Sequence, residues 1–238
     1  FQGKQYHILG TPKNGTFSQK LLVDREQVFA MPPHLDLIEA AALPLAGLTA
    51  YRALFTRCQA QAGEKLLITG IGGGVALFCL QFAVAIGMEV FVTSSADEKI
   101  SRAVDLGAKG GANYRDSAWN KSLQKTVPNG FDVIIDSAGG EGFQHLVKLC
   151  APGGRMGIYG GTKGTITDIS PQLIFWRQIS ILGSTMGSDK DFAEMLAFVE
   201  AHAIRPVIDS VHKMEAAEKA FSRMAAGKQF GKIVVDMA

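Results

Sequence analysis

The sequence predicts an α/β fold built around a parallel sheet, and two features indicate it. From residue 66 onward, short apolar runs alternate with longer segments that have helical spacing. Strands that alternate with helices need crossover connections, which make the strands parallel and cover both faces of the sheet. In addition, the first apolar run leads directly into glycines and then into an apolar helix, an order typical of the first unit of a doubly wound sheet.

The expected strands are rich in β-branched or aromatic residues and are bounded by Gly, Ser, Asn or Pro; they span 66–71, 89–93, 131–136, 155–159 and 179–183. The helices expected between them span 74–86, 97–106, 118–125, 141–149 and 171–177. Helix 74–86 is hydrophobic nearly all round, so we expect it to be buried against the sheet. The last helix follows Ser170, a natural N-cap, with Pro171 in the favoured first position.

Both flanks differ from this central pattern. On the N-terminal side, residues 15–23 alternate as a strand would, and the segment A-M-P-P at 30–33 ends that pattern. On the C-terminal side we expect a helix, a strand, a helix and a last strand, at 189–202, 205–211, 215–227 and 231–235. The two flanks therefore read as two parts of another domain wrapped around the central α/β unit.

Composition excludes several classes of protein. Lysine and arginine number 24 against 22 acidic residues, so the chain lacks the excess of positive charge that a nucleic acid partner requires. The longest apolar stretch, 75–88, contains Gln81 and is too short to span a bilayer. The three cysteines form no C-x-x-C pair, which indicates reduced thiols in a cytoplasmic protein. The sequence begins at Phe1 without a secretory signal, and we expect that it lacks its original beginning.

A glycine-rich turn carries the main functional signal; the chain reads T-G-I-G-G-G-V-A at 69–76. Glycines let the backbone approach a diphosphate, whose charge then lies at the N-terminus of the following helix. One such dipole contact contributes only about 0.3–1 kcal/mol, so several N–H groups must converge. The match to G-x-G-x-x-G is imperfect, because Ile71 takes the first glycine position, Gly73 the second and Ala76 the third. We expect a dinucleotide site here, in preference to a glycine-rich turn without a ligand.

The end of the next strand favours NADP over NAD. NAD-binding folds carry an acidic residue there that holds the ribose 2′-hydroxyl, whereas this strand ends in Thr93, Ser94 and Ser95. Small hydroxyl groups leave room for a 2′-phosphate, which Lys99 can neutralise. Charge-assisted hydrogen bonds contribute roughly 1.5–3 kcal/mol each, enough to favour NADP about ten- to hundredfold. Asp97 offers an alternative contact to a ribose, although it is better placed to open the following helix.

Eight segments occur in a familiar order along almost the whole chain. They are A-A-L-P-L-A-G-L-T-A-Y-R-A-L at 41–54, A-G-E-K-L-L-I-T-G-I-G-G-G-V-A at 62–76, L-G-A-K at 106–109, N-Y-R at 113–115, F-D-V-I-I-D-S-A-G-G at 131–140, P-G-G-R at 152–155, I-L-G-S-T-M-G-S at 181–188 and G-K-I-V-V at 231–235. In these segments the chain resembles the medium-chain dehydrogenase/reductase superfamily, in its zinc-independent, quinone-oxidoreductase-like branch.

The resemblance implies a Rossmann domain inserted into a GroES-like catalytic domain, of which this chain carries only a part. Residues 1–43 would be a remnant of the catalytic domain, 44–187 the Rossmann domain and 188–238 the segment that returns to the catalytic domain. The resemblance also implies the residues that contact NADP: Gly73, Gly74 and Val75 at the diphosphate, Ser94, Ser95, Lys99 and Tyr114 around the 2′-phosphate, and Thr49, Ala138, Gly160 and Leu182 along the ribose and nicotinamide.

The resemblance further implies chemistry without a metal. Zinc-dependent relatives place a cysteine ligand four residues before the threonine that corresponds to Thr49, whereas this chain has Leu45. His7 and His34 lie apart from other ligand residues in the sequence. The pattern Tyr159-x-x-x-Lys163 matches the proton-donor motif of short-chain dehydrogenases, but the intervening glycines make an accidental match the better interpretation.

The functional hypothesis from sequence is therefore an NADPH-dependent oxidoreductase that passes a hydride to a quinone or an α,β-unsaturated carbonyl, with no catalytic residue identified. A zinc-dependent alcohol dehydrogenase and a non-catalytic NADPH-binding module remain the alternatives. We expect a small-molecule substrate and no membrane partner. The strand at 179–183 resembles the edge strand through which relatives pair, which predicts a homodimer.

Overall fold

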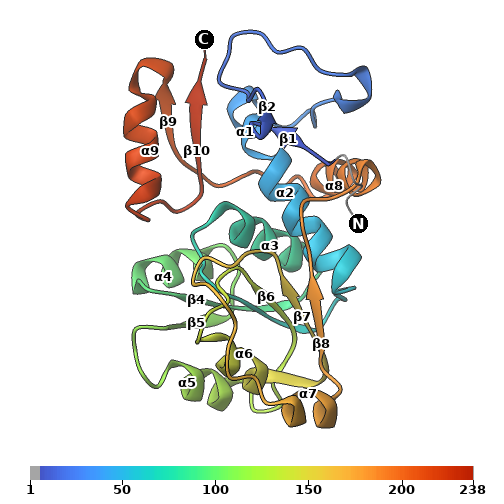
Figure 1. Cartoon of the computed structure of the whole chain (residues 1–238), viewed down its shortest axis with the longest axis vertical. Coiled ribbons are helices and arrows are strands. Elements are labelled where there is room, and N and C mark those ends of the chain that lie inside the picture. Colours follow the sequence, from blue (N-terminus) through green and yellow to red (C-terminus); the bar gives the residue numbers. More distant parts are fainter. Residues whose placement is uncertain (1–5, 238) are drawn as a thin grey trace.

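A six-stranded parallel sheet forms the centre of the computed structural model, which describes residues 6–237 (Figure 1). The strands are β3 (Lys65–Ile68), β4 (Glu89–Ser94), β5 (Gly110–Asn113), β6 (Phe131–Asp136), β7 (Cys150–Ile158) and β8 (Ser180–Gly183). Their order across the sheet is β5-β4-β3-β6-β7-β8, so the order reverses between β3 and β6. This is the strand order of the Rossmann fold, and it confirms the predicted doubly wound α/β architecture.

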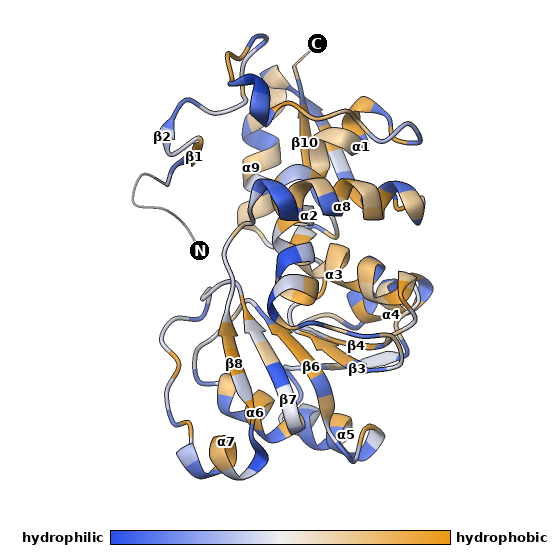
Figure 2. Ribbon diagram, turned by 90° about the vertical axis from the view of Figure 1, so that its right-hand side faces the viewer, coloured by the Kyte–Doolittle hydropathy of each residue, from blue (hydrophilic) through white to orange (hydrophobic). Residues whose placement is uncertain are grey.

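Helices cover both faces of this sheet. On one face α3 (Gly74–Ala85) and α4 (Asp97–Asp105) share a core with Leu66, Ile68 and Val133. On the other face α5 (Trp119–Thr126), α6 (Phe143–Leu149) and α7 (Pro171–Arg177) pack around Leu67 and Ile134. Successive residues of one strand therefore enter opposite cores, which is why each central strand is a continuous apolar run, orange in Figure 2.

Strand β5 is absent from the elements expected from sequence. Its residues, Gly110-Gly-Ala-Asn113, form no apolar run, and they become a strand by pairing with β4. Gly111 is required by this pairing, because a Cβ there would lie 2.4 Å from the carbonyl oxygen of Val92. Pairing with a neighbour thus overrides a local sequence that has little strand propensity.

A second, smaller part of the molecule lies above the sheet in Figure 1. It contains α1 (Leu37–Ala42), β9 (Ile208–Lys213), the short helix η3 (Met214–Ala216), α9 (Ala217–Ala225) and β10 (Lys232–Asp236), with β9 and β10 paired in parallel. Helix α2 (Pro44–Tyr51), its π-helical continuation η2 (Arg52–Arg57) and α8 (Asp189–Ala201) lie between this part and the sheet.

The strand expected at 15–23 was a wrong prediction, since the structure has none there. Instead, β1 (Ile8–Leu9) and β2 (Pro12–Lys13) precede an irregular loop and η1 (Arg25–Gln27). Three of the loop's apolar residues, Phe17, Leu21 and Leu22, are exposed, so no buried face orders this segment as a strand. Phe1 and the start of the predicted segment 1–43 lie outside the described residues.

The two flanks of the sequence meet in space, as the wrapped arrangement requires. Helix α1 packs against β9 and β10. The His34 ring Nε2 lies 2.9 Å from the Ile204 carbonyl oxygen, and Arg205 pairs with Glu39 at 2.6 Å. The boundaries at 43 and 187 stay predictions.

Among helices in residues 6–237, none has the length and apolar character needed to cross a bilayer.

Candidate functional site

The glycine turn lies at the carboxyl end of β3, beside the point where the strand order reverses. Gly70 and Gly72 have φ values of +67° and +119°, a region that L-residues with side chains rarely adopt. The Gly70 N–H donates to Thr93 Oγ1 at 3.3 Å, and the Ile71 N–H donates to the Thr93 carbonyl at 2.8 Å. The turn is thus fixed to the end of β4, where a ribose is recognised in folds of this order.

Gly73 and Gly74 open helix α3, and Val75 follows them. Gly73 is the N-cap, and since it has no side chain, the first N–H groups of α3 receive no side-chain cap. A Cβ at Gly73 would meet no atom within 4 Å. Free N–H groups above an open space at the start of a long helix fit a diphosphate, which is the group that the sequence predicts here.

Lys232 is a residue near this turn that the sequence did not reveal as part of the site. Its aliphatic chain lies over α3, since a Cβ at Gly74 would be 2.6 Å from Lys232 Cδ. Burial lowers the pKa of Lys232, and within residues 6–237 no carboxylate forms an ion pair with it. A phosphate at the turn would supply the missing negative charge. Lys232 belongs to the G-K-I-V-V segment, but only the fold shows that this segment returns to Gly74.

Ser94, Ser95 and Tyr114 lie together at the end of β4, as the resemblance implies. Ser94 is buried, and its Oγ accepts a hydrogen bond from the Ala96 N–H at 3.3 Å. Ser95 is half-buried and directly follows the strand. The Tyr114 N–H donates to the Ser94 carbonyl at 2.9 Å, while the Tyr114 side chain is 44% exposed. The end of β4 therefore presents hydroxyl groups rather than a carboxylate.

Lys99 lies beside the glycine turn and contacts the C-terminal segment. Its Nζ donates to the Gly227 carbonyl at 2.9 Å, and its Cδ would be 3.0 Å from a Cβ at Gly72. Burial lowers the pKa of Lys99, an effect that nearby Asp209 opposes. The Gly231 N–H also donates to the Gly72 carbonyl, at 3.0 Å. The C-terminal segment is thus packed directly against the turn.

A cavity of about 670 Å³ extends from the turn along the carboxyl ends of β3, β4 and β6. This volume is within the range of small-molecule sites, roughly 300–1,000 Å³. Of the predicted site residues, Tyr114 and Ala138 line it. Other lining residues come from the strand ends and from the loop after β7; they include Thr69, Gly70, Thr93, Asp136, Ser137 and Lys163.

Asp136 organises the floor of this cavity. Its carboxylate is 1% exposed and accepts hydrogen bonds from Thr69 Oγ1 at 2.5 Å and from the Gly139 N–H at 2.8 Å. These bonds join the end of β3 to the loop after β6, across the point where the strand order reverses. Sequence reasoning placed Asp136 only as the last residue of a strand, because its partners are remote in sequence.

Thr49, Gly160 and Leu182 do not line the cavity. Thr49 is buried in α2, where its Oγ1 donates to the Leu45 carbonyl at 2.8 Å. Gly160 follows β7, and a Cβ there would lie 2.9 Å from the Ser137 carbonyl. Leu182 is half-buried in β8 and packs against the core that contains α3. Their expected contacts with ribose and nicotinamide stay predictions.

The described residues offer no ligand set for zinc. Leu45 is 51% exposed in the first turn of α2, and no three His, Cys, Asp or Glu side chains in residues 6–237 lie close enough to hold a metal ion. Tyr159 and Lys163 do not share a helix, because the chain leaves β7 and turns between them, so their motif match is accidental.

Burial raises the pKa of Cys58 to about 11 and that of Cys150 to about 12. These thiols are therefore neutral at ordinary pH.

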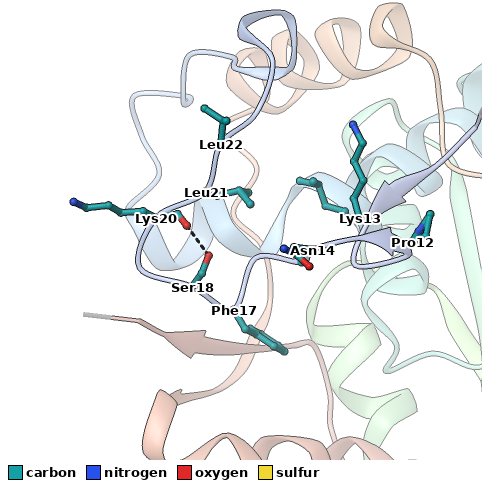
Figure 3. A pocket seen from close by; sticks show the side chains of 10 residues that line it. Pro12, Lys13, Asn14, Phe17, Ser18, Lys20, Leu21 and Leu22 are labelled. Atoms are coloured by element: carbon teal, nitrogen blue, oxygen red, sulfur yellow. Dashed lines mark hydrogen bonds between the residues drawn. The ribbon is translucent and has the colours of Figure 1, made fainter.

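A further cavity, of about 880 Å³, lies within the N-terminal loop (Figure 3). Its labelled side chains point in different directions from the loop, with Lys20 directed outward and Phe17 away from Leu22. The hydrogen bond drawn there joins Ser18 Oγ to the Lys20 carbonyl at 2.9 Å. No predicted site residue lines this cavity, and its groups do not converge on a common point.

Comparisons with known proteins give consistent results. Residues 74–201, more than half of the chain, match the zinc-binding dehydrogenase family. The zinc-type alcohol dehydrogenase-like protein YogA of Leptosphaeria maculans is 38% identical over 94% of this chain and 65% of its own length. The chain thus spans about two thirds of that curated relative.

Solved structures of full dehydrogenases share the fold. The crystal structure of an NAD-dependent alcohol dehydrogenase is 32% identical, with a TM-score of 0.93 over 99% of this chain and 69% of its own. Quinone oxidoreductase from Thermus thermophilus, solved alone and with NADPH, is 28% identical, with a TM-score of 0.83 over 95% of this chain and 75% of its own.

Proposed function

The chain belongs to the zinc-binding dehydrogenase family of the medium-chain dehydrogenase/reductase superfamily, and on that basis we propose that it is part of an NADPH-dependent oxidoreductase. Its substrate is a quinone or an α,β-unsaturated carbonyl. The hydride acceptor is thus an electron-poor carbon of a small molecule. Quinone oxidoreductases among the similar proteins support this substrate class.

The open space at Gly73, in the same turn as a cavity that begins at Gly70 and follows the ends of β3, β4 and β6, is the observation that carries the proposal. A dinucleotide extends across this edge in folds with the same strand order. The preference for the 2′-phosphate rests on Ser94 and Ser95, which replace the carboxylate typical of NAD sites. Lys99 supports it only by moving, since its ammonium donates to Gly227 in the structure.

Each part of the site has a role that follows from its geometry. Bound NADPH supplies the hydride, and the chain's residues hold and orient the coenzyme. The N–H groups at the start of α3 and the Lys232 ammonium bind the diphosphate, while Asp136 and Thr69 fix the two loops that border the ribose. The resemblance, rather than the geometry, assigns Thr49, Gly160 and Leu182 to the nicotinamide side. Precise positioning of the reacting carbon is the main contribution that such a site makes to the rate.

The test combines coenzyme binding and turnover on one sample. We expect NADPH fluorescence to rise on titration with the chain and NADPH to bind at least tenfold more tightly than NADH. A protein that includes the N-terminal region of its relatives should oxidise NADPH with members of a panel of quinones and enals. Binding without turnover in that protein would leave the non-catalytic module as the better description, and absence of binding would refute the proposal.

A zinc-dependent alcohol dehydrogenase is the second candidate, because the relative with 38% identity carries the name zinc-type alcohol dehydrogenase-like protein. By the resemblance, Leu45 occupies the position of a cysteine that binds zinc in zinc-dependent relatives, which argues against this candidate. Metal analysis separates the two: one equivalent of zinc per active site, with alcohol-dependent reduction of NADP, would favour the alcohol dehydrogenase. The reductase requires no zinc for turnover.

The proposal includes a homodimer in the cytoplasm. Strand β8 is the last strand of the sheet, so its outer edge has no neighbouring strand in the described chain. A second copy that pairs along β8 would cover this edge and continue the sheet. Three buried, free cysteines suit a reducing compartment.

A further inference from the structure

The cavity beyond the glycine turn has an aromatic end, where Tyr114 alone has an expected coenzyme contact, with the 2′-phosphate, and Trp119 has none. Tyr114, from the loop after β5, and Trp119, the first residue of α5, both line it. Leu146 of α6 adds an apolar side chain. The rest of the lining is dominated by glycines, hydroxyl groups and Asp136. The cavity is therefore polar near the strand ends and aromatic near α5.

Trp119 is held in place by α6. Its ring centroid lies 5.9 Å from that of His145, with an angle of 85° between the ring planes, which is an edge-to-face contact. The next residue, Asn120, places its Nδ2 at 3.0 Å from His145 Nδ1. The indole is half-buried, so a part of it stays accessible from the cavity. A fixed, partly exposed aromatic surface loses little side-chain entropy when a flat ligand stacks on it.

The position of the aromatic end relative to the turn indicates which group of the coenzyme would bind there. Gly70, in the turn, and Thr93, which accepts a hydrogen bond from it, line the same cavity, so the cavity begins three residues before Gly73, where the diphosphate is proposed to bind. Tyr114 is hydrogen-bonded through its N–H to Ser94, the end of the strand where the adenosine ribose is recognised. The group of the coenzyme that is attached to this ribose is the adenine base.

We propose that Trp119, together with Tyr114, forms the stacking platform for the adenine base of the coenzyme. This inference rests on the proposed function, because it requires a dinucleotide at the turn. Adenine has a flat π-surface, and stacking on an aromatic residue is the interaction through which proteins bind bases without reading their edges. Trp119 is thus a determinant of affinity for the adenosine half and takes no part in hydride transfer.

The test uses adenosine 2′,5′-bisphosphate, which lacks the nicotinamide half, and NADPH. The chain has two tryptophans, Trp119 and the exposed Trp176, so each can be made the only fluorescent indole. With Trp176→Phe, adenosine 2′,5′-bisphosphate should quench the remaining Trp119 emission. With Trp119→Phe, the remaining Trp176 emission should not change. Quenching that reports on Trp176 alone would overturn the proposal.

Affinity gives the second measurement. Trp119→Leu should weaken adenosine 2′,5′-bisphosphate binding about tenfold, the effect typical of losing one base–aromatic stack. Trp119→Phe should stay within about threefold of wild type, since it keeps an aromatic face. Tyr114→Leu should also weaken binding, and its exposure makes a folding defect a poor explanation of that loss. Trp176→Leu is the matched control and should bind as wild type does.

The outcomes separate this inference from the proposed function. If wild type binds neither NADPH nor adenosine 2′,5′-bisphosphate, the proposed function fails and the platform fails with it. If wild type binds both and Trp119→Leu binds them equally well, only the platform is refuted. Thermal melting of Trp119→Leu checks that the contact with His145 is not needed for folding.

Discussion

Gly73 adopts a backbone conformation that any L-residue tolerates, with φ −76° and ψ 152°. Glycine is therefore not needed there for its conformational freedom. The neighbouring Gly70 and Gly72 do need it, because both have positive φ. What distinguishes Gly73 is the open space that its missing Cβ leaves at the start of α3. This difference allows a substitution that separates ligand binding from folding.

We predict that Gly73→Ala folds as wild type does but binds NADPH at least tenfold more weakly, because its methyl group occupies the space of the diphosphate. Thermal melting and NADPH fluorescence titration measure the two effects. Gly154→Ala provides the opposite case: its Cβ would lie 2.5 Å from Cys150 Sγ and 2.8 Å from the Ala151 carbonyl. That variant should melt earlier, while the protein that stays folded binds NADPH normally. Unchanged affinity in Gly73→Ala would contradict the predicted site.

The proposed preference for NADPH rests on the absence of a carboxylate at the end of β4. We predict that Ser95→Asp lowers NADPH affinity about tenfold or more and spares NADH, because the new carboxylate repels a 2′-phosphate and accepts a hydrogen bond from a 2′-hydroxyl. Paired titrations with the two coenzymes measure the change in preference. Ser101→Asp, at an exposed position further along α4, adds the same charge and should leave the preference unchanged. Equal losses for both coenzymes would indicate a general disturbance instead.

At the scale of secondary-structure elements, Asp191 joins α8 to the α2–η2 segment. It lies in the first turn of α8, where it forms a capping box with Ser188. Its carboxylate also accepts hydrogen bonds from Arg52 Nη1 and Thr56 Oγ1, both at 2.5 Å. Burial raises the pKa of Asp191, but the hydrogen bonds from Ser188, Thr56 and Arg52 outweigh it and lower the pKa to about 2.

A carboxyl group with a lowered pKa stabilises the folded state above its unfolded pKa, near 3.9, and loses that contribution as the pH falls toward its folded pKa. We predict that wild type loses about 2 kcal/mol of unfolding free energy through this group between pH 5 and pH 2. Asp191→Asn should destabilise the protein by about 3 kcal/mol at pH 6 and remove most of this acid dependence. Urea unfolding at several pH values measures both. Asp189→Asn, exposed in the same turn, should change neither.

The elements that were predicted well from sequence are those whose burial requires an apolar run or an apolar face in the local sequence. Strands β3, β4 and β6 are apolar runs because both of their faces are covered, and α3 is apolar all round because it packs against α2 and the sheet. Strand β5 has no such apolar run, and its Gly111 is required by the close approach of the Val92 carbonyl oxygen. The alternation at 15–23 was misleading for the converse reason: within residues 6–237 this segment pairs with no strand.

The same reasoning applies to the candidate site. Ser94, Ser95 and the glycine turn were predictable because they lie within one strand–turn–helix unit and the strand that follows it. Lys232 reaches Gly74 from the last strand, and Trp119 reaches the cavity from α5. Their importance depends on how distant parts of the chain fold back to the sheet, which local spacing does not encode.

At the scale of the whole molecule, the proposed homodimer depends on the outer edge of β8. Ile181 is 37% exposed on this strand. We predict that wild type elutes as a dimer in size-exclusion chromatography and that Ile181→Lys elutes as a monomer, because a lysine on an edge strand opposes pairing with another strand. Val104→Lys is the control: Val104 is 44% exposed on α4, near the opposite edge of the sheet, and should stay dimeric. A monomeric wild type would contradict the proposed assembly.

Two hydrogen bonds join the C-terminal segment to the first strand–helix unit, and they affect whether that unit can be separated from the rest of the chain as a fragment. The bonds from Gly231 to Gly72 and from Lys99 to Gly227 hold residues 227–231 against the turn. A chain cut after residue 187 would retain all six strands of the sheet but would lose this packed segment, together with Lys232. The proposed nucleotide site is therefore not separable as an autonomous module, since the residues that border it are encoded some 150 residues apart.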